Sequence, residues 1–103
     1  MSHDRISKAL DLLGKFPDND LSRFNLAQAY VDANDFQKAA EHLRPLCAKK
    51  SDWMVAHISL GKCLLAVGEK VEAKKFFEHA RQLAIEQHHD GPLEEVTELL
   101  KSL

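Results

Sequence analysis

One pattern of residues occurs twice along this chain, at a constant offset that takes Leu26 to Leu60. Positions of similar character pair up at this offset as Leu26 and Leu60, Ala27 and Gly61, Tyr30 and Leu64, Asn34 and Gly68, Ala39 and Ala73, Leu43 and Phe77, and Leu46 and Ala80. A fixed period of this length, about 34 residues, is typical of a helix–turn–helix unit used more than once, each unit burying its apolar face against its neighbours. We call this offset the repeat period and expect a stack of helical hairpins.

Composition sets two classes of partner aside. The 103 residues are enough for one domain. A net charge of −2 argues against a nucleic-acid surface, which needs clustered Lys and Arg in excess. No stretch approaches the ~20 apolar residues of a membrane span. The first residues lead into an amphipathic segment and not into a secretory signal. We expect neither a nucleic-acid nor a membrane partner.

Cysteine and histidine residues are the candidates for metal or thiol chemistry. Cys47 and Cys63 are too few for a disulfide scaffold, which favours a reducing cytoplasm, and both are expected to act as small buried apolar side chains. His88 and His89 are adjacent, so on a helix their side chains would diverge. No Cys or His pair has the short spacing of a zinc site. Three further histidines, His42, His57 and His79, are expected at helix surfaces. No metal or other cofactor is expected.

Apolar residues at helical spacing predict about six helices and no strand. Pro17 ends the first helix because it disfavours a helical conformation at the preceding residue. Asn34 tolerates the left-handed conformation that ends a helix, and Gly68 adopts it at little cost. The helices are expected in the segment up to Phe16, in Leu21–Ala33, Phe36–Lys49 and Asp52–Val67, between Gly68 and Asp90, and from Pro92 to the end.

Polar residues before these helices are candidate N-caps, whose side chains accept a hydrogen bond from a free backbone N–H. Asp18 or Asp20 could cap the second helix, and Ser51-Asp52 is expected to begin the fourth. Pro45 lies inside the third helix, where it cannot donate to the Glu41 carbonyl and should bend the chain.

The paired positions resemble the signature of the tetratricopeptide-repeat family. In that family a first helix carries Leu-Gly/Ala followed by a large residue, and a second helix alternates small and large residues. The matching residues are Leu26-Ala27, Tyr30, Asn34-Asp35, Ala39 and Leu43, and again Leu60-Gly61, Leu64, Gly68-Glu69, Ala73, Phe77 and Ala80. The resemblance covers residues 1–85 and implies an all-α, right-handed α-α superhelix of stacked helical hairpins.

The same resemblance divides the single domain, residues 1–103. Ile85 stands where the family has a junction proline, so the helix there is expected to continue, and Trp53 is expected to wedge between the repeats. The parts are a half-repeat helix (1–17), a first repeat (20–53), a second repeat with an extended last helix (54–90) and a capping helix (92–103).

In this family the first helices line a groove, and counting from the repeat pattern gives its side chains. That surface mixes apolar anchors with hydrogen-bonding groups, which suits an extended peptide or an amphipathic helix. The alternatives are that the N-terminal helix or a second copy of the chain covers part of it. The predicted residues are Leu21, Phe24, Asn25, Gln28, Val31, Asp32, Val55, Ile58, Ser59, Lys62 and Leu65.

The chain has neither a Gly-rich phosphate loop nor a nucleophile signature with a placed base. One version of the family grips the C-terminal carboxylate of heat-shock chaperones with Lys, Asn and Arg. Here the matching positions hold Phe24, Gln28 and Ser59, and a third first helix is not expected. The sequence therefore predicts a non-catalytic adaptor or scaffold for a protein or peptide partner. A homodimer formed through the groove is the first alternative, and a metal- or thiol-dependent regulator is the second.

Overall fold

The computed structural model describes residues 2–103, with side chains from Asp4 onward. Six α-helices joined by short turns make up this part of the chain, and it contains no strand. They are α1 (Ser2–Lys15), α2 (Asp20–Asp32), α3 (Phe36–Lys49), α4 (Met54–Ala66), α5 (Lys70–Glu86) and α6 (Asp90–Lys101).

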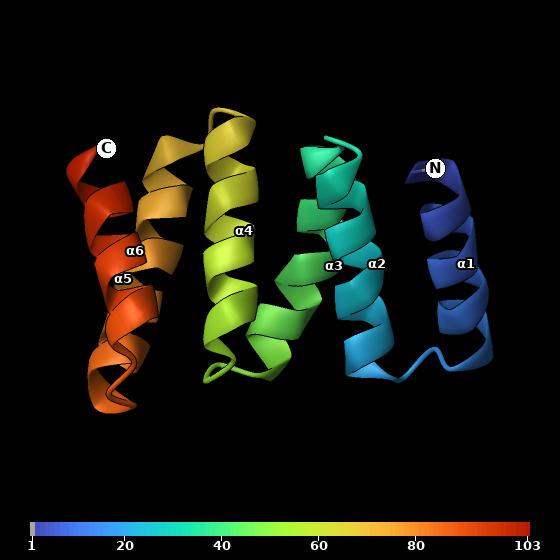
Figure 1. The fold of residues 1–103 in the computed structure, drawn as a ribbon, viewed down its shortest axis with the longest axis horizontal. Helices are drawn as coiled ribbons and strands as arrows, with labels where there is room; N and C mark the ends of the chain where they lie inside the picture. Colours follow the sequence, from blue (N-terminus) through green and yellow to red (C-terminus); the bar gives the residue numbers. More distant parts are fainter. Residues whose placement is uncertain (1) are drawn as a thin grey trace.

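The helices stand side by side in chain order along the long axis, so the two ends of the chain lie at opposite ends of the stack (Figure 1). The described residues extend over 37 × 26 × 21 Å. Every extensive helix–helix contact joins neighbours in the sequence: α1 with α2, α2 with α3, and so on to α5 with α6. This one-dimensional pattern is what stacked hairpins require.

The repeat period is visible directly in the helix bounds. Shifting α1 by one repeat period gives the bounds of α3, and shifting α2 gives those of α4. The exception is α5, which has 17 residues against 14 in α3. The predicted continuation of this helix past Ile85 is confirmed, since α5 ends at Glu86.

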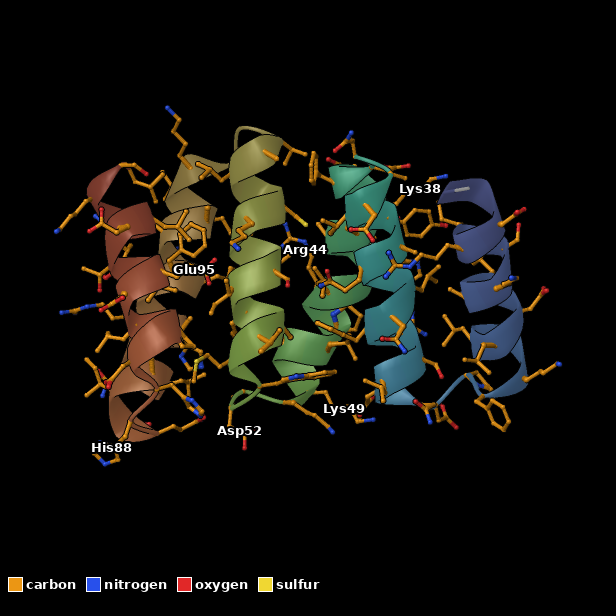
Figure 2. The ribbon with its side chains drawn as sticks, viewed as in Figure 1. Lys38, Arg44, Lys49, Asp52, His88 and Glu95 are labelled. Carbon is orange, nitrogen blue, oxygen red and sulfur yellow. The ribbon has the colours of Figure 1, made fainter. Side chains whose placement is uncertain are left out.

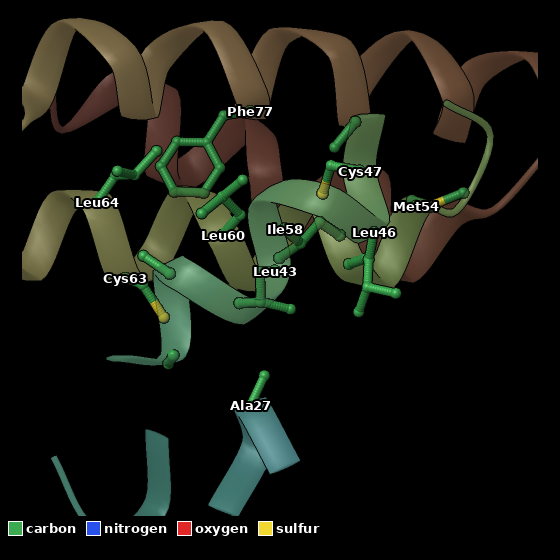
Figure 3. Close-up of a cluster of buried hydrophobic side chains, with 14 of the residues drawn as sticks. Ala27, Leu43, Leu46, Cys47, Met54, Ile58, Leu60, Cys63, Leu64 and Phe77 are labelled. Carbon is green, nitrogen blue, oxygen red and sulfur yellow. The ribbon is translucent and has the colours of Figure 1, made fainter. Parts of the chain in front are cut away.

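Small residues on first helices face large residues on second helices. Gly61 of α4 has no room for a side chain, because a Cβ there would lie 2.5 Å from Cε1 of Phe77. Phe77 on α5, with Leu60 and Leu64 on α4, belongs to one buried cluster that runs through the stack (Figure 3). Close approach of helices at small residues, with large neighbours filling the remaining space, gives interiors their density.

The helix ends follow the prediction in part. Asn34 (φ 62°) and Gly68 (φ 88°) adopt the left-handed conformation, as expected, and His88 (φ 57°) does so at a position that carries no such signal. The N-cap of α2 is Asn19, not Asp18 or Asp20. Its side-chain oxygen accepts a hydrogen bond from the backbone N–H of Ser22 at 2.8 Å, because the Asn side chain stands three residues before that free donor.

The start of α4 also differs from expectation, and α3 continues through Pro45. α4 begins at Met54 with Trp53 at the N-cap and no side-chain cap bond, so the expected start at Ser51-Asp52 is wrong. The start of α4 instead keeps the period set by α2. α3 runs through Pro45 to Lys49. Pro45 and Glu41 are both exposed, so water can bond to the carbonyl that Pro45 cannot serve. Likewise α6 begins at Asp90 and places Pro92 in its first turn, where no N–H is needed.

Candidate interaction surface

Two polar contacts show that α2, α4 and α6 share one face of the stack. The Gln28 side-chain amide on α2 donates to the Ser59 hydroxyl on α4 at 3.0 Å. One turn further along α4, the Lys62 ammonium lies 2.6 Å from the Glu95 carboxylate on α6, which projects between the two helices in Figure 2. We call the surface carried by these three helices the first-helix face. α6 therefore lies where the first helix of a third repeat would lie, although the sequence analysis did not expect such a helix.

The exposed apolar part of this face comes from the two equivalent residues Leu21 and Val55. Leu21 on α2 is 60% exposed and Val55 on α4 is 54% exposed. Between them Phe24 is half-buried, with its ring 4.9 Å from the ring of Trp53. The Lys50 ammonium lies 5.5 Å from the Trp53 ring centre. Trp53 thus lies at the junction between repeats, as predicted.

The predicted polar residues are mostly held by partners within the chain. Gln28 and Ser59 bind one another, and Lys62 is paired with Glu95. Asp32 forms an ion pair with Arg5 of α1, so the first helix does contact one end of this face. Asn25 is exposed.

Three predicted apolar residues offer little surface. Ile58 is only 7% exposed and belongs to the buried cluster, so its assignment as a contact residue is corrected. α4 packs against α3 and α5 and buries side chains on most of its circumference, which leaves position 58 covered. Val31 and Leu65 are half-buried and pack against the same cluster.

Sequence reasoning missed an apolar notch beside Leu21. Leu12 and Phe16 on α1 are 43% and 55% exposed. A cavity of about 310 Å³ is lined by these three side chains together with Asn19, Ser22 and Asn25. We call this cavity the α1–α2 notch. Leu12 lies one repeat period before Leu46. Leu46 is buried in α3, whereas Leu12 at the equivalent position of α1 is exposed.

A second cavity lies on the other side of the stack, around His57. Contrary to the expected surface position, His57 is buried, because its ring lies beside two rings of α5, 6.0 Å from that of Phe76 and 4.6 Å from that of His79. Its Nδ1–H donates to the Trp53 carbonyl at 2.8 Å. His79 Nε2–H donates to the Ser51 carbonyl at 2.6 Å. Burial lowers the pKa of His57 below its ordinary value. The cavity has a volume of about 420 Å³ and is lined also by Glu72, Lys75 and Phe76.

The two thiols are enclosed, as expected. Cys47 and Cys63 are both buried and unbonded. Burial raises the pKa of Cys47 to about 12 and that of Cys63 to about 11, so both are protonated at neutral pH. Among the described side chains, no three or more His, Cys, Asp or Glu residues converge on a point that could hold a metal ion. None of the six described helices has the length and apolar character needed to cross a membrane.

Comparisons with known proteins agree with this architecture. A TPR repeat-containing protein of Pseudomonas aeruginosa, PA0015, is 32% identical over 92 residues, which cover 89% of this chain and 88% of that protein. The solution structure of protein BPP2914 from Bordetella parapertussis superposes with a TM-score of 0.80 and 26% sequence identity. The match covers 94% of this chain and 84% of that one. No family model matches the chain.

Proposed function

Because this chain belongs to the tetratricopeptide-repeat family, we propose that it is a non-catalytic adaptor that holds a protein partner on its first-helix face. Protein–protein interaction is what membership of the family suggests. The observation that supports this face is the pair Leu21 and Val55, two large apolar side chains exposed at the same position of successive repeats. Apolar anchors of this kind supply most of the affinity of an interface when a partner covers them.

The polar groups beside these anchors favour a partner that presents side chains rather than backbone. Gln28, Ser59 and Lys62 already bond to other residues of the chain, so their remaining hydrogen-bonding capacity is small. An amphipathic helix bonds its own backbone internally and needs only apolar contacts from its receptor. An extended peptide would have to break these bonds. We therefore propose a helix as the bound element. We also propose that the interaction takes place in the cytoplasm, in keeping with the two free cysteines.

Capture of partners from extracts of the source cell tests the proposal. The test variant is Leu21→Ser with Val55→Ser, and the matched control is Val71→Ser, an exposed residue on α5 away from this face. We expect at least one protein that the wild type and the control recover equally. The double variant should bind it about thirtyfold more weakly or worse, since two anchor truncations cost more than ~1 kcal/mol each. Circular dichroism melts should agree among the three proteins.

Equal recovery of every bound protein by the double variant would place the interface elsewhere and refute the proposal. Sedimentation over a range of dilutions checks the homodimer. A dimer that the Leu21→Ser, Val55→Ser variant loses and the Val71→Ser control keeps would make a second copy the partner, in place of the adaptor role.

A further inference from the structure

The α1–α2 pair has the same helix lengths and spacing as the α3–α4 pair one repeat period later, and this repetition shows what the notch lacks. The bounds of the two pairs differ by one repeat period at every end. In the α3–α4 pair, helix α2 lies against α3, and Leu46 of α3 is only 2% exposed. In the α1–α2 pair, no helix of residues 2–103 takes the equivalent place, and Leu12, the counterpart of Leu46, stays exposed. The contacts of α2 with α3 and α4 are thus a template for an occupant of the notch.

We infer that the α1–α2 notch binds a helix of a partner protein that carries two acidic residues one turn apart, the second followed directly by a large apolar residue. This inference rests on the proposed function, because a helix in the notch would lie between α1 and Leu21, beside the N-terminal end of the first-helix face. The chemistry follows from replacing three contacts of α2, those with Lys49, His42 and Trp53, by their counterparts one repeat period earlier.

The acidic preference comes from two lysines of α1. Asp20 of α2 bonds to the Lys49 ammonium at 3.0 Å, and the counterpart of Lys49 is Lys15. An acidic residue at the Asp20 position of the occupant therefore meets Lys15. Both Lys15 and Lys8 are exposed, and neither is paired with a carboxylate in the part of the chain that the structure describes.

The second acidic position distinguishes the occupant from α2 itself. Arg23 donates to the His42 ring nitrogen Nδ1 at 3.0 Å, and the counterpart of His42 is Lys8. An arginine at that position of the occupant would be repelled by Lys8, whereas a glutamate would be attracted. The two acidic positions are separated by one helical turn, which puts them on the same side of a helix.

The apolar position follows from Phe24. In the α3–α4 pair its ring lies 4.9 Å from that of Trp53, and the counterpart of Trp53 is Asn19, which lines the notch. An aromatic ring entering there would contact Leu12 and Phe16 on one side and Leu21 on the other. These are the apolar groups that the notch now leaves open to solvent.

Arg5 limits the length of the bound segment. It stands where α3 has Ala39, a fully buried residue at a close helix crossing, and it is drawn toward Asp32. The C-terminal half of the occupant must therefore carry a small residue opposite Arg5. Recognition is concentrated in the first two turns, beside Lys15 and Lys8.

Two capped synthetic peptides provide the test, each copying residues 20–32 with Tyr30→Ala, which puts a small residue in the C-terminal half. One peptide also carries Arg23→Glu and the other keeps Arg23. Titrations of the whole chain followed by NMR should show the Glu peptide binding about fivefold more tightly at low salt, a difference that shrinks as salt screens the charges. The perturbed amides should be those around Leu12, Phe16 and Leu21.

The variant Lys8→Glu should reverse this preference, which separates the contact with Lys8 from any difference in peptide helicity. The matched control Lys70→Glu, at the exposed start of α5, should leave it unchanged. Leu12→Ser with Phe16→Ser should abolish binding of both peptides while the protein stays folded.

Equal affinities for the two peptides, no binding by either, or perturbations centred on α4 and α6 would overturn the inference. So would self-association that Leu12→Ser alone removes, since the occupant would then be a second copy. Partner capture that depends on Val55 but not on Lys8, Leu12 or Phe16 would refute the inference and leave the proposed function standing. Partner capture that is unaffected by substitution of Val55 would refute the proposed function itself.

Discussion

At the scale of single residues, the stack depends on matching a small side chain on one helix to a large one on the next. The sequence positions of Gly61 and Phe77 in the second repeat are those of Ala27 and Leu43 in the first. All four residues are buried. The first repeat combines alanine with leucine, and the second combines glycine with phenylalanine. A larger residue at one position of a pair therefore requires a smaller residue at the other.

Gly61→Ala is therefore expected to destabilise the protein although alanine favours helix. The new Cβ would lie 2.5 Å from Cε1 and 2.8 Å from Cδ1 of the Phe77 ring, which is fully buried and has nowhere to move. Overpacking costs about 1–3 kcal/mol against a gain of up to ~1 kcal/mol in helix propensity, so unfolding in urea should show a net loss.

The matched control for this substitution is Gly14→Ala, because a Cβ at Gly14 meets no atom within 4 Å. It should leave the free energy of unfolding unchanged or raise it by up to ~1 kcal/mol. Adding Phe77→Leu to Gly61→Ala recreates the Ala27–Leu43 pair, and the two changes should couple favourably by about 1 kcal/mol. A Gly61→Ala protein as stable as Gly14→Ala would contradict this packing.

His57 is expected to make stability depend on pH. Burial and then the charge of His79 lower the pKa of His57 below its ordinary value of 6.5, against the opposing hydrogen bond to Trp53. As the pH falls through about 6.5, the unfolded chain takes up a proton that folded His57 resists, so stability is present above that pH and is lost below it. His42 acts in the same direction, since burial and then Arg23 lower its pKa.

Urea unfolding at several pH values between about 5.5 and 7.5, a range set around the ordinary pKa of histidine, measures this effect. His57→Asn, which cannot take up a proton in that range, should flatten the fall in the free energy of unfolding toward acid. His88→Asn is the control, because His88 is exposed and asparagine tolerates its left-handed backbone conformation. An unchanged slope in His57→Asn would assign the pH dependence to other groups.

At the scale of helices, the period predicted the order and the packing faces better than the ends. The breaks at Asn34 and Gly68 were readable because these residues tolerate positive φ. The end of α5 was not, because helices end most often at Gly or Asn, whereas the residue with positive φ there is His88. Asn19 was overlooked between two aspartates that cap equally well in isolation.

The candidate surface was predictable only where exposure follows from the period alone. Leu21 and Val55 satisfy that condition, since both lie one position after a helix start and away from the neighbouring helices. Ile58 fails it because α4 is enclosed on more sides than α2. Lys62 is removed from free binding by Glu95 of α6, a helix whose start at Asp90 falls outside the repeat period.

At the scale of the whole molecule, the absence of extensive contacts beyond neighbouring helices makes the chain a linear array in its described part. The Arg44–Glu72 pair, at 2.6 Å, links α3 to α5, but both side chains are well exposed. Such a surface pair contributes at most about 1 kcal/mol. Stability therefore comes from each interface between successive helices, and one interface can be added without rebuilding the others.

Inserting a second copy of residues 20–53 after Trp53 should accordingly give a folded chain with one more hairpin. The copied unit carries helices of 13 and 14 residues, and its second helix would meet α4 as α3 does in the native chain. Far-ultraviolet circular dichroism should gain helical signal in proportion, with a single transition no less stable than the wild type. Insertion of only residues 20–36, half a period, at the same place should disrupt folding. The inserted copy of α2 would then be followed by α4 and would lack a second helix of its own. If both insertions unfold alike, the repeat unit is not an independent element of the stack.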